Sequence, residues 1–127
     1  MVSTSTIREK MELYVQLVNQ RDIDAILELY DDNATVEDPV GSEPLAGIEA
    51  ISRFYREGLG QSEASAEQTG EVRTTISGEG AIPFQVKVTF EGRPCVITVI
   101  DVMQFNDAGK ITSMKAYWSQ DNLEVLA

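Results

Sequence analysis

Hydrophobic residues in the first half of the chain recur at the spacing of amphipathic helices. The segment Thr6–Glu9 resembles a capping box that would begin the first helix. Asp22 can cap a second, short helix, and a third is predicted from about Ile48 to Glu57, with Gly58 or Gly60 available to end it. The apolar stripes of the three helices are, in order, Ile7, Met11, Tyr14, Val15 and Val18; then Ile23, Ile26, Leu27 and Tyr30; then Ile48, Ile51, Phe54 and Tyr55.

The second half of the chain changes to the two-residue alternation of β-strands. At 81–90, apolar side chains alternate with mostly polar or small ones, which indicates a strand with one dry and one wet face. Turns separate it from further strands at 96–105 and 111–118, and a weak pattern at 61–68 allows a short strand. Helices followed by strands, without a repeat or a linker, indicate a single α+β domain over residues 1–127. Three N-terminal helices would cover the concave face of a curved, mostly antiparallel sheet.

Asp101 interrupts the apolar run at 96–105, which is otherwise typical of a buried strand. Alternation directs its side chain to the same face as Val99 and Met103, the face expected to be driest. A buried carboxyl without a cation beside it tends to keep its proton, because desolvation raises its pKa. It would then donate a hydrogen bond at neutral pH. The alternative is a salt-bridged Asp or one at a bulge, and the strand pattern leaves both interpretations open.

Asp38 is the second carboxyl in an unusual position. Pro39 restricts the residue before it to extended backbone, so Asp38 should end a short strand. It is in phase with Ala34 and Val36 and faces inward, whereas Glu37 faces outward. Such an Asp at a pocket rim can act as a base, but Asp-Pro also commonly initiates a turn without any chemistry. Spacing does not distinguish the two.

The strand that contains Asp101 is also mostly apolar on its other face, at Val96, Thr98, Ile100 and Val102. Helices cannot easily cover both faces of one sheet, which predicts a homodimer that buries this outer face. The competing account is an extra layer from the end of the chain, where Leu123, Val125 and Leu126 supply the apolar side chains.

Composition removes several kinds of chemistry. The chain has no histidine, so Ser-His-Asp and Cys-His mechanisms and the common zinc sites are excluded. The single cysteine, Cys95, cannot form an intramolecular disulfide and is expected to be a small core residue, which favours a reducing, cytoplasmic location.

The net charge of the chain limits the kinds of partner that it is expected to bind. A formal charge of −11, spread along the chain, repels phosphate backbones and anionic membranes. Nucleic acid and membrane partners are therefore not expected, and a neutral or cationic small molecule is favoured. The polar first residues do not resemble a signal peptide, and no apolar run is long enough to span a bilayer.

Several segments carry a family resemblance: Met11–Val15 around Tyr14, Asp31–Gly41 around Asp38, Phe54–Arg56, Val99–Met103 around Asp101, and Ala116–Ser119. Together they make the chain similar to the bacterial ketosteroid isomerases, within the nuclear-transport-factor-2-like (NTF2-like) group of cone-shaped α+β folds that enclose an apolar pocket. The resemblance extends over nearly the whole chain. It implies a steroid Δ5-isomerase that works without metal or other cofactor.

The resemblance implies a role for each of the three polar residues. The proton-transferring base falls on Asp38, the oxyanion tyrosine on Tyr14 and the protonated oxyanion acid on Asp101. These isomerases are themselves a known example of an aspartic acid kept neutral by an apolar site. The implied reaction converts a 3-oxo-Δ5-steroid to its Δ4 isomer by intramolecular proton transfer through a dienolate.

Two further groups of residues follow from the resemblance. Tyr30 and Tyr55 would extend a phenol network behind Tyr14, although each could equally be an ordinary core aromatic. A long apolar slot for a flat tetracyclic substrate is expected to be lined by Phe54, Phe84, Val99, Met103, Met114 and Trp118. Departures from the family pattern at 61–68 and at Ile82 leave the preferred steroid open.

Two other functions stay open. Another enzyme activity of the same fold, such as epoxide opening or polyketide cyclisation, would need a different polar constellation, for example an arginine between two acids. A non-catalytic carrier of apolar ligands would bind steroid without needing Asp38.

Overall fold

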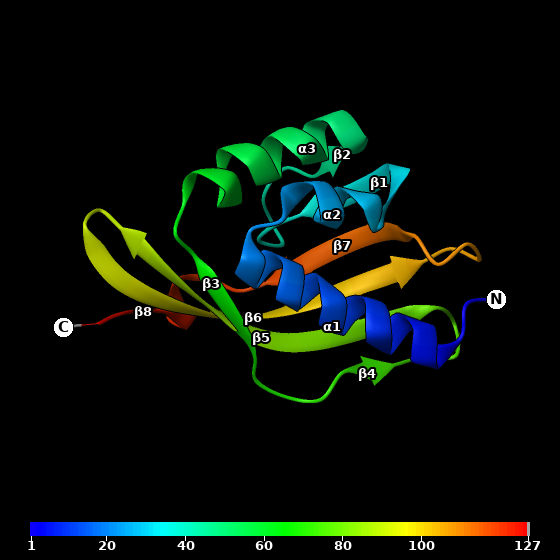
Figure 1. Cartoon of the computed structure of the whole chain (residues 1–127). Coiled ribbons are helices and arrows are strands. Elements are labelled where there is room, and N and C mark those ends of the chain that lie inside the picture. The colour runs from blue at the N-terminus through cyan, green and yellow to red at the C-terminus, as the bar shows by residue number, and fades with distance from the viewer. Residues whose placement is uncertain (127) are drawn as a thin grey trace.

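The computed structural model describes residues 1–126 and shows helices packed against one curved sheet (Figure 1). The helices are α1 (Thr4–Gln20), α2 (Ile23–Glu28) and α3 (Ile48–Glu57), with 3-10 turns η1 (Leu59–Gln61) and η2 (Gln120–Asn122). The strands are β1 (Tyr30–Glu37), β2 (Leu45–Ala46), β3 (Ser65–Gln68), β4 (Arg73–Thr74), β5 (Glu79–Phe90), β6 (Arg93–Phe105), β7 (Ile111–Tyr117) and β8 (Leu123–Val125).

The ends of the three helices are set by capping residues. Helix α1 begins earlier than predicted, because Ser3 rather than Thr6 is the N-cap and its hydroxyl accepts a hydrogen bond from the Thr6 amide. Asp22 caps α2 as predicted, through the Ala25 amide. Gly58 ends α3, also as predicted.

The sheet has the order β2-β1-β7-β6-β5-β3, with β4 paired to β5 and β8 paired to β6. Most pairs are antiparallel, as expected, but β1 runs parallel to β7. This pairing joins the first strand to the last long strand of the chain. The sequence predicted only an antiparallel meander, so the parallel pair was not expected. Asp101 lies in the centre of the sheet, opposite Ile82 of β5 and Ala116 of β7.

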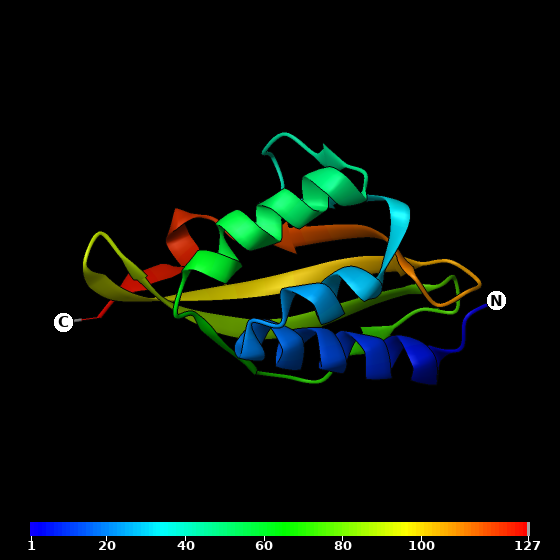
Figure 2. The same ribbon diagram turned by 45° about the horizontal axis from the view of Figure 1, so that its top comes forward.

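The core fills the space between the helices and the concave face of the sheet. Its members on β6 are Val99, Met103 and Phe105, in phase with Asp101. The hairpin formed by β5 and β6 extends beyond the helices and curls at its tip, with β8 alongside it (Figure 2). Strand β8 therefore pairs with β6 within the sheet and does not form a layer over the outer face. Among residues 1–126, no helix is long and apolar enough to cross a membrane.

Candidate active site

A cavity of about 200 Å³ lies between the concave face of the sheet and helices α1 and α3. It brings together the three polar residues singled out from the sequence, although they come from α1, the end of β1 and the middle of β6. Four of the six predicted apolar lining residues also contribute. The lining consists of Tyr14, Val18, Asp38, Phe54, Tyr55, Gly58, Leu59, Phe84, Val86, Ile97, Val99, Asp101 and Trp118.

Asp101 is buried, with 2% of its surface exposed. Its Oδ1 atom has no hydrogen-bond partner within the described residues. Burial raises the pKa of this carboxyl well above its ordinary value, and the negative charge of Asp38 raises it further. The protonated form is therefore favoured, and the unpartnered Oδ1 is available to a ligand.

Three buried tyrosines form a hydrogen-bonded chain, and two of them, Tyr14 and Tyr55, line the same cavity. The Tyr55 hydroxyl lies 2.8 Å from the Tyr14 hydroxyl and 2.6 Å from the Tyr30 hydroxyl. Burial raises the pKa of all three phenols, and the hydrogen bond from Tyr55 partly opposes this effect at Tyr14. If Tyr30 donates to Tyr55 and Tyr55 donates to Tyr14, the Tyr14 proton stays free to point into the cavity.

Asp38 lies directly after β1 and also lines the cavity. The indole Nε1–H of Trp118 donates a 2.8 Å hydrogen bond to its Oδ1. Burial raises the pKa of Asp38, whereas this hydrogen bond lowers it. The turn that follows is fixed by backbone and side-chain contacts, since Glu37 accepts a hydrogen bond from the Gly41 amide and the Val40 amide bonds to the carbonyl of Ala116.

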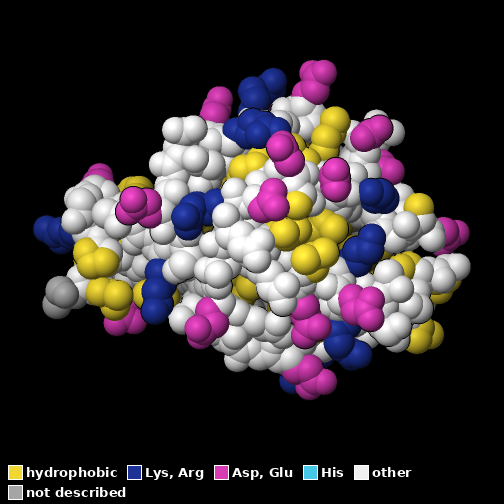
Figure 3. All heavy atoms as spheres, in the orientation of Figure 1, with side chains coloured by type: hydrophobic (Ala, Val, Ile, Leu, Met, Phe, Trp, Pro, Cys, Tyr) yellow, Lys and Arg dark blue, Asp and Glu magenta, His cyan; other side chains and the backbone are white. Residues whose placement is uncertain are grey.

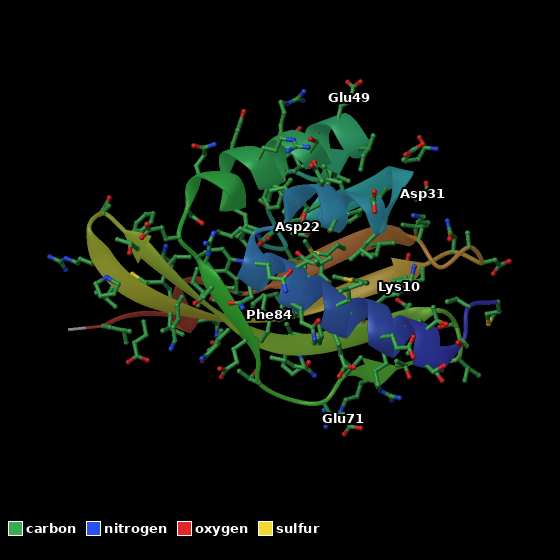
Figure 4. All side chains as sticks on the ribbon, viewed as in Figure 1. Lys10, Asp22, Asp31, Glu49, Glu71 and Phe84 are labelled. Carbon is green, nitrogen blue, oxygen red and sulfur yellow. The ribbon has the colours of Figure 1, made fainter. Side chains whose placement is uncertain are left out.

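Two predicted lining residues lie elsewhere. Met103 and Met114 are opposite each other on β6 and β7 and are almost fully buried in the core beyond Asp101, away from the cavity lining. Strand β6 lines the cavity at Ile97, Val99 and Asp101, and no residue of β7 is part of the lining. Figure 4 shows Phe84 near the middle of the molecule, whereas Asp31, Glu49 and Glu71 lie at its periphery.

Sequence reasoning did not name some lining residues. Gly58 and Leu59 follow α3 and lack any periodic pattern, so no signal marks them. Val18, Val86 and Ile97 share faces with residues that were named, and their strand or helix phase could have identified them. The hydrogen bond from Trp118 to Asp38 joins positions 80 residues apart and could not be read from local spacing.

The SnoaL-like domain family matches residues 11–114, a span that includes Tyr14, Asp38 and Asp101. The chain belongs to the SnoaL-like domain family. A steroid Delta-isomerase of Nocardioides simplex is 39% identical over 101 residues, which are 80% of this SnoaL-like chain and 80% of that protein.

A solved structure of SalBIII gives the comparison in three dimensions. That protein is described as an epoxide hydrolase/cyclase-like enzyme with a role in pyran ring formation in the polyether salinomycin. It superposes with a TM-score of 0.85 at 28% identity, over 93% of this SnoaL-like chain and 94% of its own. These matches confirm the NTF2-like α+β fold and the resemblance to steroid isomerases that the sequence motifs indicated.

The SnoaL-like cavity combines groups of different character. One carboxyl, Asp38, sits beside an indole donor, and a second, Asp101, lies among apolar side chains next to the phenol of Tyr14. Among the described residues that line the cavity, none is Lys or Arg. This arrangement can accept a proton at Asp38 and donate hydrogen bonds from Asp101 and Tyr14.

Proposed function

We propose that this protein is a steroid Δ5-isomerase, which converts 3-oxo-Δ5-steroids to 3-oxo-Δ4-steroids. The observation that carries the proposal is a buried, unpartnered carboxyl, Asp101, in one apolar cavity with Tyr14 and Asp38. The similarity to a steroid Delta-isomerase over 80% of the chain supports the same activity.

Asp38 acts as the base in this mechanism. Its ionised carboxylate removes a proton from C4 of the substrate, and the electrons of that C–H bond move into the ring system to give a dienolate. The same carboxyl, now protonated, returns the proton to C6 as the C4=C5 double bond forms. No atom is gained or lost, and the Trp118 indole keeps the carboxylate oriented between its two proton transfers.

Tyr14 and protonated Asp101 stabilise the charge that develops on the C3 oxygen. Both donate hydrogen bonds to the dienolate oxygen, in a cavity from which the substrate excludes water. Because Asp101 must be neutral for this role, its burial serves the chemistry directly. The chain Tyr30–Tyr55–Tyr14 orients the reacting phenol and polarises it.

The test follows formation of the conjugated enone by ultraviolet absorbance with a 3-oxo-Δ5-steroid. We expect fast turnover by the wild type and a loss of about a hundredfold or more for Asp101→Ala, since one oxyanion donor is typically worth about 3 kcal/mol. Asp38→Asn should lose more, because it removes the only proposed proton carrier. Asp107→Asn, on an exposed turn, is the matched control and should retain wild-type activity.

Other outcomes would indicate other functions. Tight binding of a planar phenolic steroid without turnover would indicate a carrier. Turnover of an epoxide by the wild type would favour the activity class of SalBIII, the SnoaL-like fold neighbour. The absence of Arg and Lys from the described cavity lining argues against that alternative, because nothing there would hold two acids charged side by side.

The protein is proposed to act as a homodimer. Ile100 and Tyr117, which are opposite each other on β6 and β7, are 46% and 49% exposed on the outer face of the sheet. Val96 and Val102 lie half-buried on the same face. A second copy would cover this apolar surface.

A further inference from the structure

A groove adjoins the cavity along the hairpin of β5 and β6, and its lining also includes residues of η2 and β8. Figure 2 shows that this part of the hairpin extends beyond the helices. The groove has a volume of about 570 Å³, which is larger than that of the cavity. Its apolar walls are formed by Val88, Phe90, Ile97, Trp118, Leu123 and Val125.

The groove and the cavity are adjacent. Ile97 and Trp118 line both of them, and Trp118 is also the residue that contacts Asp38. The inward face of the sheet passes without interruption from Phe84, which lines the cavity, to Val88 and Phe90, which line the groove. Phe90 lies four residue steps along β5 from Val86, so the groove adds about 13 Å to the apolar path.

The groove presents apolar side chains to solvent. Phe90 is 59% exposed and Val125 is 49% exposed, and neither contributes to the cavity. Figure 3 shows hydrophobic side chains gathered at this end of the molecule, near the C-terminus. The charged residues of its lining, Glu91 and Arg93, carry opposite signs. The groove therefore offers a surface for a neutral aliphatic group and no net charge to select an ion.

We propose that this groove binds an aliphatic side chain carried by the far end of the steroid, so that the enzyme prefers substrates with a C17 alkyl chain over those without one. This inference rests on the proposed isomerase function. A ring system whose C3 oxygen contacts Tyr14 and Asp101 would have its opposite end directed past Trp118, toward the groove. The side chain would then bury the exposed faces of Phe90 and Val125.

The experiment compares kcat/KM for two 3-oxo-Δ5-steroids, one with a branched alkyl chain at C17 and one without. We expect the wild type to favour the alkyl substrate. The double variant Phe90→Ser, Val125→Ser should reduce kcat/KM for the alkyl substrate about tenfold and change the other by less than about twofold. Val125→Trp, which fills the groove without removing apolar surface, should also disfavour only the alkyl substrate.

Ile76→Ser is the matched control, because Ile76 is 89% exposed in a turn outside both the cavity and the groove. It should leave both rates unchanged. The inference is overturned if the wild type shows no preference, if the double variant lowers both rates equally, or if it becomes monomeric where the wild type is dimeric. Failure of the wild type to isomerise either steroid would instead overturn the proposed function, and the groove assignment with it.

Discussion

Asp38 and Asp101 share one cavity but have different surroundings, and their proposed roles follow from that difference. Asp38 accepts a hydrogen bond from an indole, which favours its charged form, whereas the Oδ1 atom of Asp101 has no partner within the described residues. Strand alternation predicted that both side chains face inward. It could not predict Trp118 as the donor, or Tyr55 as the link between Tyr14 and Tyr30, because tertiary packing brings these distant positions together.

The first prediction concerns the stability cost of Asp101. Because its pKa is raised in the folded protein, the unfolded chain releases this proton first as the pH rises, above about 3.9. Stability therefore falls with rising pH until the folded pKa is reached. Asp101→Asn, which cannot ionise, should be more stable than the wild type at pH 7, and its advantage should grow by up to about 2.7 kcal/mol from pH 5 to pH 7.

Urea unfolding of the wild type and Asp101→Asn at both pH values measures this effect, and contributions from other groups largely cancel in the difference. Asp107→Asn controls for the loss of one negative charge from an exposed position. An equal difference at pH 5 and pH 7 would mean that Asp101 is ionised in the folded protein, and the donor role would fail.

The second prediction concerns Trp118. Its hydrogen bond lowers the pKa of Asp38 against the effect of burial, so Trp118→Phe should let that pKa rise. Because the base must be ionised, the acidic limb of the pH profile of kcat/KM should move to higher pH. Tyr117→Phe, at the neighbouring position but on the outer face, should leave the profile in place. A uniform drop in rate without a shift would assign Trp118 a packing role only.

Among the helices and strands, the features that follow from local periodicity were predicted from the sequence, whereas pairings between distant segments were not. Helix α3 has its predicted bounds, because its apolar stripe is flanked by Gly47 at its N-cap and Gly58 at its C-cap. The start of α1 was misplaced because Ser3 and Thr6 are both competent caps, and sequence does not decide between them. The parallel pairing of β1 with β7 depends on the chain path between them, which no local pattern encodes.

The contact of α1 with β5 gives the third prediction. A methyl group added at Gly80 would lie 2.4 Å from the Met11 sulfur and 2.7 Å from the Ile7 Cγ2 atom. Both neighbours are fully buried, so Gly80→Ala should push the helix from the sheet and reduce the free energy of unfolding by about 1 to 3 kcal/mol. Gly60→Ala, with only ordinary contacts at 3.5 Å and 3.7 Å, is the control. Equal urea midpoints for Gly80→Ala and the wild type would contradict this packing.

Seen as a whole, the molecule combines a large negative charge with exposed apolar side chains at the centre of its outer sheet face, where Lys87 and Lys115 lie beside them. Two copies with a net charge of −11 each repel one another, so an interface between them must be apolar where they meet. Ile100 and Tyr117, which are opposite each other on β6 and β7, satisfy this condition at the centre of the face. Salt screens the repulsion between copies, and we therefore expect association to strengthen as ionic strength rises.

The last prediction tests this face directly. Sedimentation at micromolar concentration should show a dimer for the wild type and a monomer for Ile100→Asp, because the variant places two like charges against each other in a desolvated interface. Ile76→Asp adds the same charge at a residue that is 89% exposed in a turn, and it should remain dimeric. If the dimer contributes to stability, the Tm of the wild type will rise with protein concentration and that of Ile100→Asp will not. If the wild type sediments as a monomer at every salt concentration, the proposed homodimer is wrong.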